Sequence, residues 1–244
     1  MLAKIQDLFL FRQQGGVSTP ILEGIEFEVE AGTFDCIMGP SGSGKTSLLY
    51  LLAGLDEVSA GSVELRGENL ATAGERRRTE LRRQQVAFVF QYFHLLPNLT
   101  LQENIALPLW IRGQNAGWQA LAKLWAERLG LGARLDALPH ELSGGERQRA
   151  SIARAMVGEQ PLILADEPTG NLSQKAGAEV MDLLRQAVDD EGRAVLLVTH
   201  NPRDAARADR VQFLVDGRLA PEPVLRGPKL AVEDVHAALA QLEI

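Results

Sequence analysis

Residues 39–46 read Gly-Pro-Ser-Gly-Ser-Gly-Lys-Thr, a complete match to the pattern G-x-x-x-x-G-K-[ST]. Glycines let such a loop curl until consecutive N–H groups point inward, which makes a cradle for phosphate oxygens. The apolar run Phe34–Met38 precedes the loop, and a helix predicted over Lys45–Ala53 follows it. The order strand, loop, helix is what this phosphate cradle requires, because the helix adds its positive N-terminal end. The stretch therefore predicts an α/β fold with a nucleotide-phosphate site.

Two side chains of this loop have expected roles. Lys45 is expected to reach the β- and γ-phosphates, and the Thr46 hydroxyl is expected to coordinate Mg²⁺. A chance match of a Gly-Ser loop is the alternative, and the flanking strand and helix argue against it. Nucleotide contacts are predicted for Gly39, Pro40, Ser41, Gly42, Ser43, Gly44, Lys45, Thr46 and Ser47.

Strand-like and helix-like segments alternate on both sides of the loop, which predicts a mostly parallel sheet covered by helices. Further strands are predicted at Leu8–Phe11, Ile25–Glu30, Ser62–Leu65, Val86–Phe90, Leu162–Ala165, Val195–Thr199 and Val211–Val215. Helices are predicted at Leu101–Leu107, Trp118–Leu129, Glu146–Val157, Lys175–Val188 and directly after Pro202. We predict one domain over residues 1–220, with a helical subdomain at about 92–155 inserted in its core. A linker and a docked helix are predicted over 221–244.

Two carboxylates end the buried strand predicted at Leu162–Ala165. Asp166 and Glu167 would then lie at the carboxyl edge of the sheet, where doubly wound folds bind ligands. Asp166 is expected to hold Mg²⁺, and Glu167 is expected to polarise the attacking water. A strand that ends in acidic residues is common by itself; next to a phosphate loop it forms a second part of one nucleotide site.

A second candidate for anion binding is the run Leu142-Ser143-Gly144-Gly145-Glu146-Arg147-Gln148. Ser143, Gly144 and Gly145 would open a helix, so that a hydroxyl, free N–H groups and the helix dipole face an anion. One phosphate cradle already serves one nucleotide, so this second helix start makes sense if it faces the ATP of another copy. A plain helix cap with Glu146 in its first turn is the alternative.

Composition and charge set further limits. The 244 residues include 25 basic and 32 acidic side chains, and the net charge of −7 argues against nucleic acid as the main partner. The single cysteine fits a reducing compartment. No apolar run approaches the length of a membrane-spanning helix, so we expect a cytoplasmic protein. The arginine-rich run after Glu75 is expected to be a solvated helix face.

These motifs resemble those of the ATP-binding cassette (ABC) ATPases, over residues 2 to 220. Leu142–Gln148 is similar to the family's signature sequence. The resemblance implies a RecA-like core with an antiparallel β part, ATP and Mg²⁺ as cofactors, and a head-to-tail dimer around two ATP molecules. It also implies a Mg²⁺-sensing role for Gln91, a γ-phosphate contact for His200, and adenine stacking on Phe11, with Phe9 as the competitor.

The closer resemblance is to the lipoprotein-release (Lol-type) and macrolide-export (Mac-type) ATPases. It rests on Phe93–Thr100, Glu103–Pro108 and Ala165–Leu172. It implies export or extraction from a membrane, together with integral membrane permease subunits and a periplasmic adaptor. The chain would then be peripheral on the cytoplasmic face of the inner membrane, its partner docked near Gln91–Trp110.

One position departs from the family pattern. Ser173 follows Asn171-Leu172 where the family usually has Asp, a residue that helps join the two ATP sites of the dimer. The departure leaves open how strongly the two sites are coupled. It also keeps a second hypothesis, in which the chain is a regulatory subunit that uses ATP-dependent dimerisation to control a membrane partner without transport.

Overall fold

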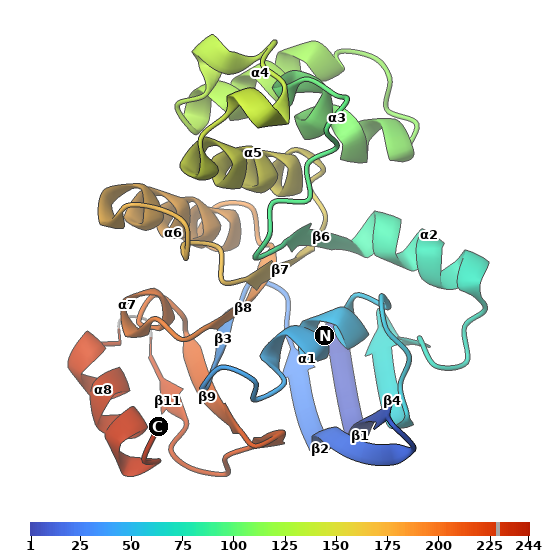
Figure 1. The fold of residues 1–244 in the computed structure, drawn as a ribbon, viewed down its shortest axis with the longest axis vertical. Coiled ribbons are helices and arrows are strands. Elements are labelled where there is room, and N and C mark those ends of the chain that lie inside the picture. The colour runs from blue at the N-terminus through green and yellow to red at the C-terminus, as the bar shows by residue number, and fades with distance from the viewer. Residues whose placement is uncertain (228–229) are drawn as a thin grey trace.

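The computed structural model describes residues 1–227 and 230–244, and its α/β architecture has two sheets and a separate group of helices (Figure 1). Residues 228 and 229, within the predicted linker, lie outside the described residues. Among the described residues, no helix has the length and apolar character needed to cross a membrane.

The main sheet is mostly parallel, as the sequence predicts. Its strand order is β10-β9-β3-β8-β7-β6, with β11 also paired to β9. Neighbours among β3, β6, β7, β8 and β9 run parallel, whereas β10 and β11 run antiparallel to β9. The strands are β3 Phe34–Met38, β6 Val86–Val89, β7 Leu162–Asp166, β8 Ala194–Thr199, β9 Arg210–Val215, β10 Arg218–Leu219 and β11 Leu225–Arg226.

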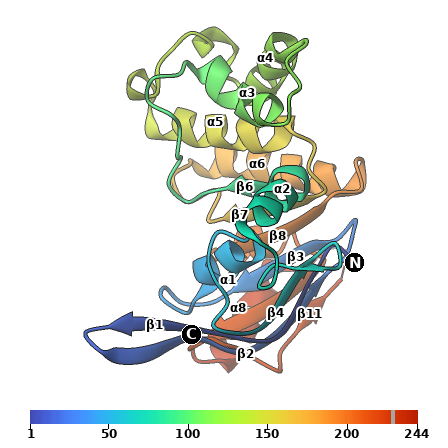
Figure 2. The ribbon, with the colours of Figure 1, turned by 90° about the vertical axis from the view of Figure 1, so that its right-hand side faces the viewer.

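The second sheet is antiparallel, with the order β2-β1-β4-β5. Its strands are β1 Ala3–Gln14, β2 Val17–Val29, β4 Ala60–Leu65 and β5 Glu68–Asn69. β1 and β2 are longer than predicted, and their outer parts form a projecting hairpin (Figure 2). The predicted strands cover the middle of β1 and the inner part of β2, and they miss Ala3–Asp7, the inner end of β1, which pairs with both β2 and β4. The polar residues at the outer end of the hairpin lack the alternation of a half-buried strand, so the pattern did not locate them.

Helix α1 (Lys45–Leu52) lies between the two sheets. Its leucines share one hydrophobic cluster with the antiparallel sheet and with one face of the main sheet, including Ile37 and Leu164. Cys36 and Ile163, each one position earlier on the same strands, belong to a second cluster with the helices of the opposite face. Successive side chains of a strand point to opposite faces, so both faces of the sheet are covered, and its strands are apolar throughout.

The helical lobe contains α3 (Leu101–Ile111), α4 (Trp118–Arg128) and α5 (Gly144–Val157), as Figure 1 shows. Two short 3₁₀ turns, Gly132–Arg134 and Pro139–Glu141, connect α4 to α5. Thr100 caps α3 in a capping box, since its hydroxyl accepts from the Glu103 N–H while the Glu103 carboxylate accepts from the Thr100 N–H.

Four more helices flank the main sheet. They are α2 (Glu75–Gln85), α6 (Gln174–Asp189), α7 (Pro202–Ala205) and α8 (Val232–Gln241). The arginine-rich segment forms α2, and most of its charged side chains are exposed. Val235 and Ala238 of α8 are buried in the same cluster as Ala205 of α7. The C-terminal helix therefore packs on the body of the protein.

Candidate nucleotide site

The loop after β3 has a backbone that only glycine fits at two positions. Gly44 has a φ of +102°, and a Cβ there would lie 2.7 Å from a side-chain atom of Leu22. A Cβ on Gly39 would lie 2.1 Å from the carbonyl oxygen of Leu214. The first and last glycines of the motif are thus required because Leu214 and Leu22 approach their Cα atoms closely. The backbone between these two glycines curls over the start of α1.

Lys45 folds back over this loop. Its Nζ donates to the carbonyl oxygens of Gly39, at 2.8 Å, and Pro40, at 2.9 Å. Burial lowers the pKa of this ammonium, while the charges of Glu167 and Asp166 oppose the change. The buried Ser43 hydroxyl of the same loop has no hydrogen-bond partner among the described residues. The loop therefore holds one cation and one polar group that phosphate oxygens would satisfy.

Thr46 and Asp166 meet although 120 positions separate them in the chain. The Thr46 hydroxyl donates to Oδ1 of Asp166 at 3.1 Å. Asp166 ends β7 and is 2% exposed. Burial raises the pKa of its carboxyl to about 6, and the hydrogen bond from Thr46 opposes the rise. A hydroxyl and a carboxylate side by side form a donor set that suits a hard divalent cation.

Glu167 is the most heavily bonded carboxylate of the site. Its Oε2 accepts from the Thr199 hydroxyl at 3.0 Å, and its Oε1 accepts from the His200 backbone N–H at 3.0 Å. The His200 Nδ1 lies 2.8 Å from the same Oε1. Glu167 also has a φ of +45°, an uncommon backbone conformation for this residue type. Bonds from the end of β8 therefore fix its side chain in a strained turn.

The predicted adenine platform lies on β1. Phe11 is 41% exposed and stacks on Phe9, with 6.2 Å between ring centroids and 6° between planes. The Phe11 backbone N–H donates to the Ser59 hydroxyl at 3.0 Å. Of the two rings, that of Phe11 is the more available to a base, so it stays the preferred candidate.

Gln91 and Ser143 lie apart from the phosphate loop. Gln91 is exposed in the segment after β6, and its carbonyl accepts from Asn171 at 3.5 Å. Ser143 caps α5 with Glu146: the hydroxyl accepts from the Glu146 N–H, and the carboxylate accepts from the Ser143 N–H. Among the described residues no hydrogen bond joins either one to residues 39–46. Within one chain the structure brings together Lys45, Thr46, Asp166, Glu167 and His200.

Three structural contacts were not predicted from the sequence. Thr199 orients Glu167, and its position at the end of a strand, directly before His200, was the available signal. The Gln148 amide donates to the Pro168 carbonyl at 2.9 Å. Ser173 caps α6, since its hydroxyl accepts from the Ala176 N–H. Ser173 thus performs a capping role that Asp also performs in proteins.

Comparisons with known proteins agree with this geometry. The family model described as ABC transporter matches residues 22–170. The lipoprotein-releasing system ATP-binding protein LolD of Shewanella oneidensis is 43% identical over 220 residues, 90% of this chain and 96% of that protein. The uncharacterized ABC transporter ATP-binding protein YbbA of Escherichia coli K12 is 45% identical over 210 residues, 86% of this chain and 92% of that protein.

The fold is also that of a solved cassette. A dimeric structure of a post-hydrolysis state of the ATP-binding cassette MJ0796, bound to ADP and Pi, superposes with a TM-score of 0.88 at 33% identity. The superposition covers 93% of this chain and 100% of that one. The chain therefore belongs to the ABC transporter family, in which it is an ATP-binding subunit that hydrolyses ATP.

Proposed function

We propose that two copies of this chain close head to tail around two ATP molecules and thereby drive a membrane partner. Each ATP would lie between residues 39–46 of one copy and the Ser143–Gly145 helix start of the other. The observation that carries the proposal is the division of the site: the phosphate loop, Asp166, Glu167 and His200 meet at one sheet edge, whereas Ser143 lies in the helical lobe. The dimeric arrangement of the MJ0796 cassette supports it.

Within one site we assign the following roles. Lys45 holds the β- and γ-phosphates, Glu167 polarises the attacking water, and His200 contacts the γ-phosphate. Phe11 stacks on adenine, and Glu146 supports the helix start that faces the γ-phosphate from the second copy. A carboxylate that already binds a histidine and a hydroxyl is well placed to orient water, because those donors fix its direction.

The residues present fit a magnesium ion. Thr46 and Asp166 supply adjacent oxygens, and Gln91 would complete the set when its exposed segment approaches the site. When bound with ATP, Mg²⁺ neutralises charge on the phosphates. Closure is favoured because the γ-phosphate supplies contacts that ADP lacks, so hydrolysis releases the dimer.

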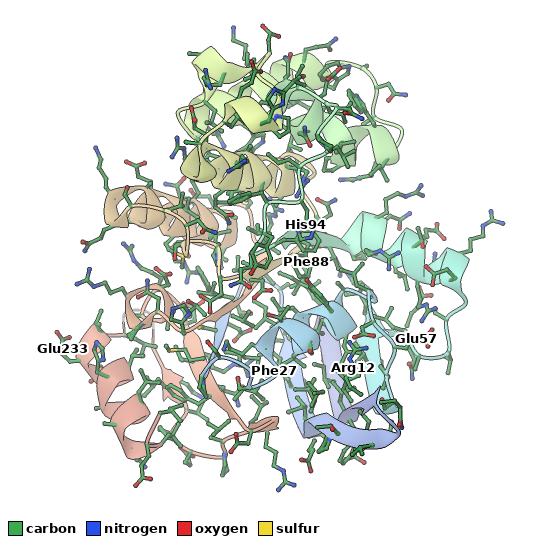
Figure 3. The ribbon with its side chains drawn as sticks, in the orientation of Figure 1. Arg12, Phe27, Glu57, Phe88, His94 and Glu233 are labelled. Atoms are coloured by element: carbon green, nitrogen blue, oxygen red, sulfur yellow. The ribbon has the colours of Figure 1, made fainter. Side chains whose placement is uncertain are left out.

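The partner is proposed to dock beside Gln91–Trp110. A mainly apolar cavity of about 390 Å³ lies there, between α2, β6 and α3. Phe88 and His94 mark this region between the two parts of the molecule (Figure 3). The charged side chains that line the cavity are Arg82, Arg83 and Arg154, so the expected occupant is an apolar cytoplasmic segment with an acidic residue.

For the cargo, we propose a lipoprotein or a related lipophilic molecule such as a macrolide, exported or extracted from the membrane. The name of the Shewanella relative, a lipoprotein-releasing system protein, supports this choice. The chain would then act at the cytoplasmic face of the inner membrane, with permease subunits and a periplasmic adaptor. A regulatory subunit without transport remains the second candidate, because Ser173 replaces the acidic residue that joins the two sites.

Dimerisation is tested with Glu167→Gln protein, in which hydrolysis is blocked and closure is retained. Sedimentation velocity is expected to show a dimer with Mg²⁺ and ATP, and a monomer with Mg²⁺ and ADP. The double variant Glu167→Gln/Ser143→Arg should stay monomeric while still binding a fluorescent ATP analogue. A dimer that forms equally well with the Ser143→Arg change would contradict the head-to-tail arrangement.

The partner is identified by affinity capture with Glu167→Gln protein and ATP from detergent-solubilised membranes, with Lys45→Met protein as the matched control. A membrane protein with few spans and a large extracytoplasmic domain would support extraction or export of the Lol or Mac type. Transport is then tested in vesicles that contain the purified partner. Stimulation of ATP hydrolysis by a lipoprotein supports transport, whereas ATP-dependent association without any effect of the cargo supports regulation.

A further inference from the structure

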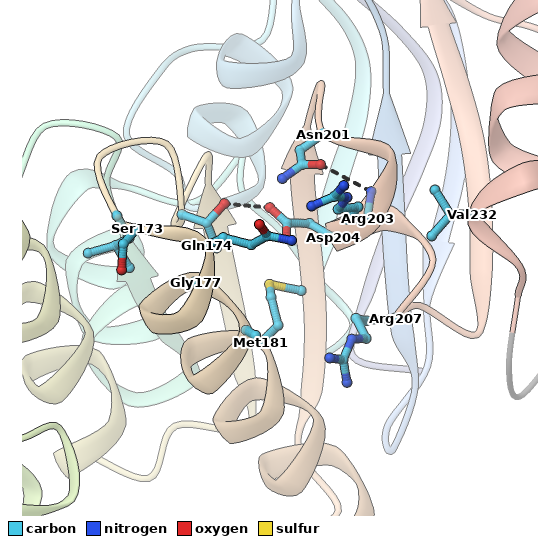
Figure 4. Close-up of a pocket in the computed structure, with 12 residues that line it drawn as sticks. Ser173, Gln174, Gly177, Met181, Asn201, Arg203, Asp204, Arg207 and Val232 are labelled. Carbon is cyan, nitrogen blue, oxygen red and sulfur yellow. Dashed lines mark hydrogen bonds between the residues drawn. The ribbon is translucent and has the colours of Figure 1, made fainter.

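Two loops carry the groups assigned to hydrolysis, and two separate links join them. The first link is Glu167, which accepts hydrogen bonds from Thr199 and His200 at the end of β8. The second link lies two residues after Glu167 on one segment and four residues after His200 on the other. There the Thr169 hydroxyl donates to Oδ2 of Asp204, a residue of α7 (dashed line at Asp204 in Figure 4).

Asp204 is a carboxylate that lies almost fully buried. It is only 6% exposed, and it follows His200 by four residues. Burial raises the pKa of its carboxyl, while the hydrogen bonds from Thr169 and Asn201 oppose the rise. The Asp204 side chain lines one wall of a cavity of about 610 Å³ between α6 and α7. Because burying a carboxylate costs free energy, a leucine would serve packing alone at least as well.

Both ends of the Thr169–Asp204 link are anchored. On the Thr169 side, Gly177 of α6 faces the Thr169 side chain, since a Cβ built on this glycine would lie in van der Waals contact with the Thr169 Cβ, at 3.4 Å. The neighbouring Pro168 carbonyl accepts from Gln148 of α5. On the other side, α7 packs against Val235 of α8, which is fully buried. Because both segments are held in place, the Thr169–Asp204 bond fixes the position of the loop after β7 relative to α7.

We propose that Asp204 is a positioning residue for ATP hydrolysis. Its bond to Thr169 holds the segment after β7 against α7, and so sets the His200 imidazole relative to the Glu167 carboxylate. Without this bond, the single turn of α7 keeps its apolar packing but has no side-chain hydrogen bond to Thr169 in the segment after β7. The inference rests on the roles proposed above for Glu167 and His200.

Three substitutions isolate this bond. Asp204→Leu removes the acceptor and keeps the branching at Cγ next to a cavity that can take the larger side chain, Thr169→Val removes the donor with little change of shape, and Asp204→Asn keeps an acceptor oxygen. Each of the first two substitutions leaves one polar group without its partner and so lowers stability, whereas the double variant replaces both partners by apolar groups at little cost. Thermal unfolding of each protein confirms that it is folded before the measurements below. The matched control is Asp182→Asn, which removes an exposed carboxylate paired with Arg207, one turn beyond Asp204.

The first measurement follows the imidazole of His200 by ¹H–¹⁵N correlation spectra. The chain has four histidines, and a His200→Gln spectrum assigns the relevant signals. Asp204→Leu and Thr169→Val are each expected to shift the His200 signals and to leave those of His140 and His236 in place. Asp204→Asn and Asp182→Asn should give the wild-type spectrum. Unchanged His200 signals in Asp204→Leu protein would overturn the proposal.

The second measurement is steady-state ATP hydrolysis. We expect Asp204→Leu and Thr169→Val each to lower kcat by about tenfold, with KM for ATP changed by less than about twofold. The double variant should be no slower than the slower single one, because both changes remove one bond. Unchanged kcat in Asp204→Leu protein, or losses that multiply in the double variant, would overturn the proposal. If Glu167→Gln protein hydrolyses ATP normally, the assigned roles fail, while the His200 spectra still report on positioning.

Discussion

The His200 imidazole and the Glu167 carboxylate are bonded to each other, with 2.8 Å between Nδ1 and Oε1. Because an ionised carboxylate only accepts hydrogen bonds, Nδ1 of the imidazole donates in this pair, which leaves Nε2 to contact another group. The two side chains assigned to water activation and to the γ-phosphate thus form one unit. A change in either is expected to disturb both functions.

The first prediction concerns Glu167→Gln. The amide keeps the size of the side chain but cannot act as a base, so kcat should fall by about 100-fold or more while ATP affinity changes by less than about threefold. Phosphate release measures the first quantity and equilibrium dialysis the second. Glu179→Gln, an exposed position on α6, is the control and should change neither kcat nor the affinity for ATP. Retained hydrolysis in Glu167→Gln protein would show that another group polarises the water.

The second prediction separates binding from stability at Lys45. Burial lowers the pKa of the Lys45 ammonium, which means that the charged form lowers the stability of the folded protein. Lys45→Met should therefore weaken ATP binding by about 100-fold, through loss of the phosphate contact, without lowering the melting temperature. Calorimetric titration and thermal unfolding measure the two effects, with exposed Lys175→Met as the control. A clear loss of melting temperature would contradict this account.

The third prediction contrasts two glycines of the phosphate loop. Gly39→Ala places a methyl group 2.1 Å from a backbone carbonyl, so we expect a loss of about 3 kcal/mol or more in unfolding free energy. Gly42 has a φ of +84° and open space around it, so Gly42→Ala should cost only about 1–2 kcal/mol. Urea unfolding of both variants tests the order. Equal losses would show that close approach does not distinguish the two positions.

The fourth prediction concerns Ser173, the cap of α6. Ser173→Ala should lower the unfolding free energy by about 1 kcal/mol, whereas Ser173→Asp should leave it unchanged within about 0.5 kcal/mol. The introduced carboxylate is expected to strengthen coupling between the two ATP sites, seen as a higher Hill coefficient for ATP hydrolysis. Gln174→Glu places the same charge one residue later and should leave the coefficient unchanged. An equal rise in both variants would assign the effect to charge alone.

The fifth prediction uses Cys36, the only cysteine of the chain. Burial raises the pKa of this thiol well above its usual value, so the folded protein favours the protonated form. The unfolded chain ionises its thiol above about pH 8.5, and stability should therefore fall as the pH rises past that value. Labelling by a disulfide reagent should occur only through unfolding, about 10³-fold more slowly than for a model peptide. Mg²⁺ and ATP should slow it further, and fast labelling of the native protein would refute burial.

Much of this fold could be predicted because its signals are local. The strand Phe34–Met38 was predicted with the bounds that the structure has, since a buried parallel strand is apolar at every position and ends at a glycine. The two-residue strands β5, β10 and β11 were missed, because two residues carry no periodicity. The outer hairpin of β1 and β2 was missed because both its faces are polar.

The site residues from the phosphate loop and from the ends of β7 and β8 were predicted from motifs and strand ends. The bond between Thr169 and Asp204 was not, because it joins residues 35 positions apart that match no motif. The same holds for Gln148 and Pro168. Contacts of this kind depend on how helices pack over the sheet, which a single sequence does not specify.

The strand order has a consequence for how the protein is made. β8 lies between β3 and β7, so the strand that completes the site is synthesised last of the three. A nascent chain that has emerged from the ribosome only as far as residue 190 holds its phosphate loop and Asp166 on strands with nothing between them. The Thr46–Asp166 contact of the finished structure therefore forms only after residues 194–199 have been made. Completion of the nucleotide site is thereby tied to completion of the main sheet.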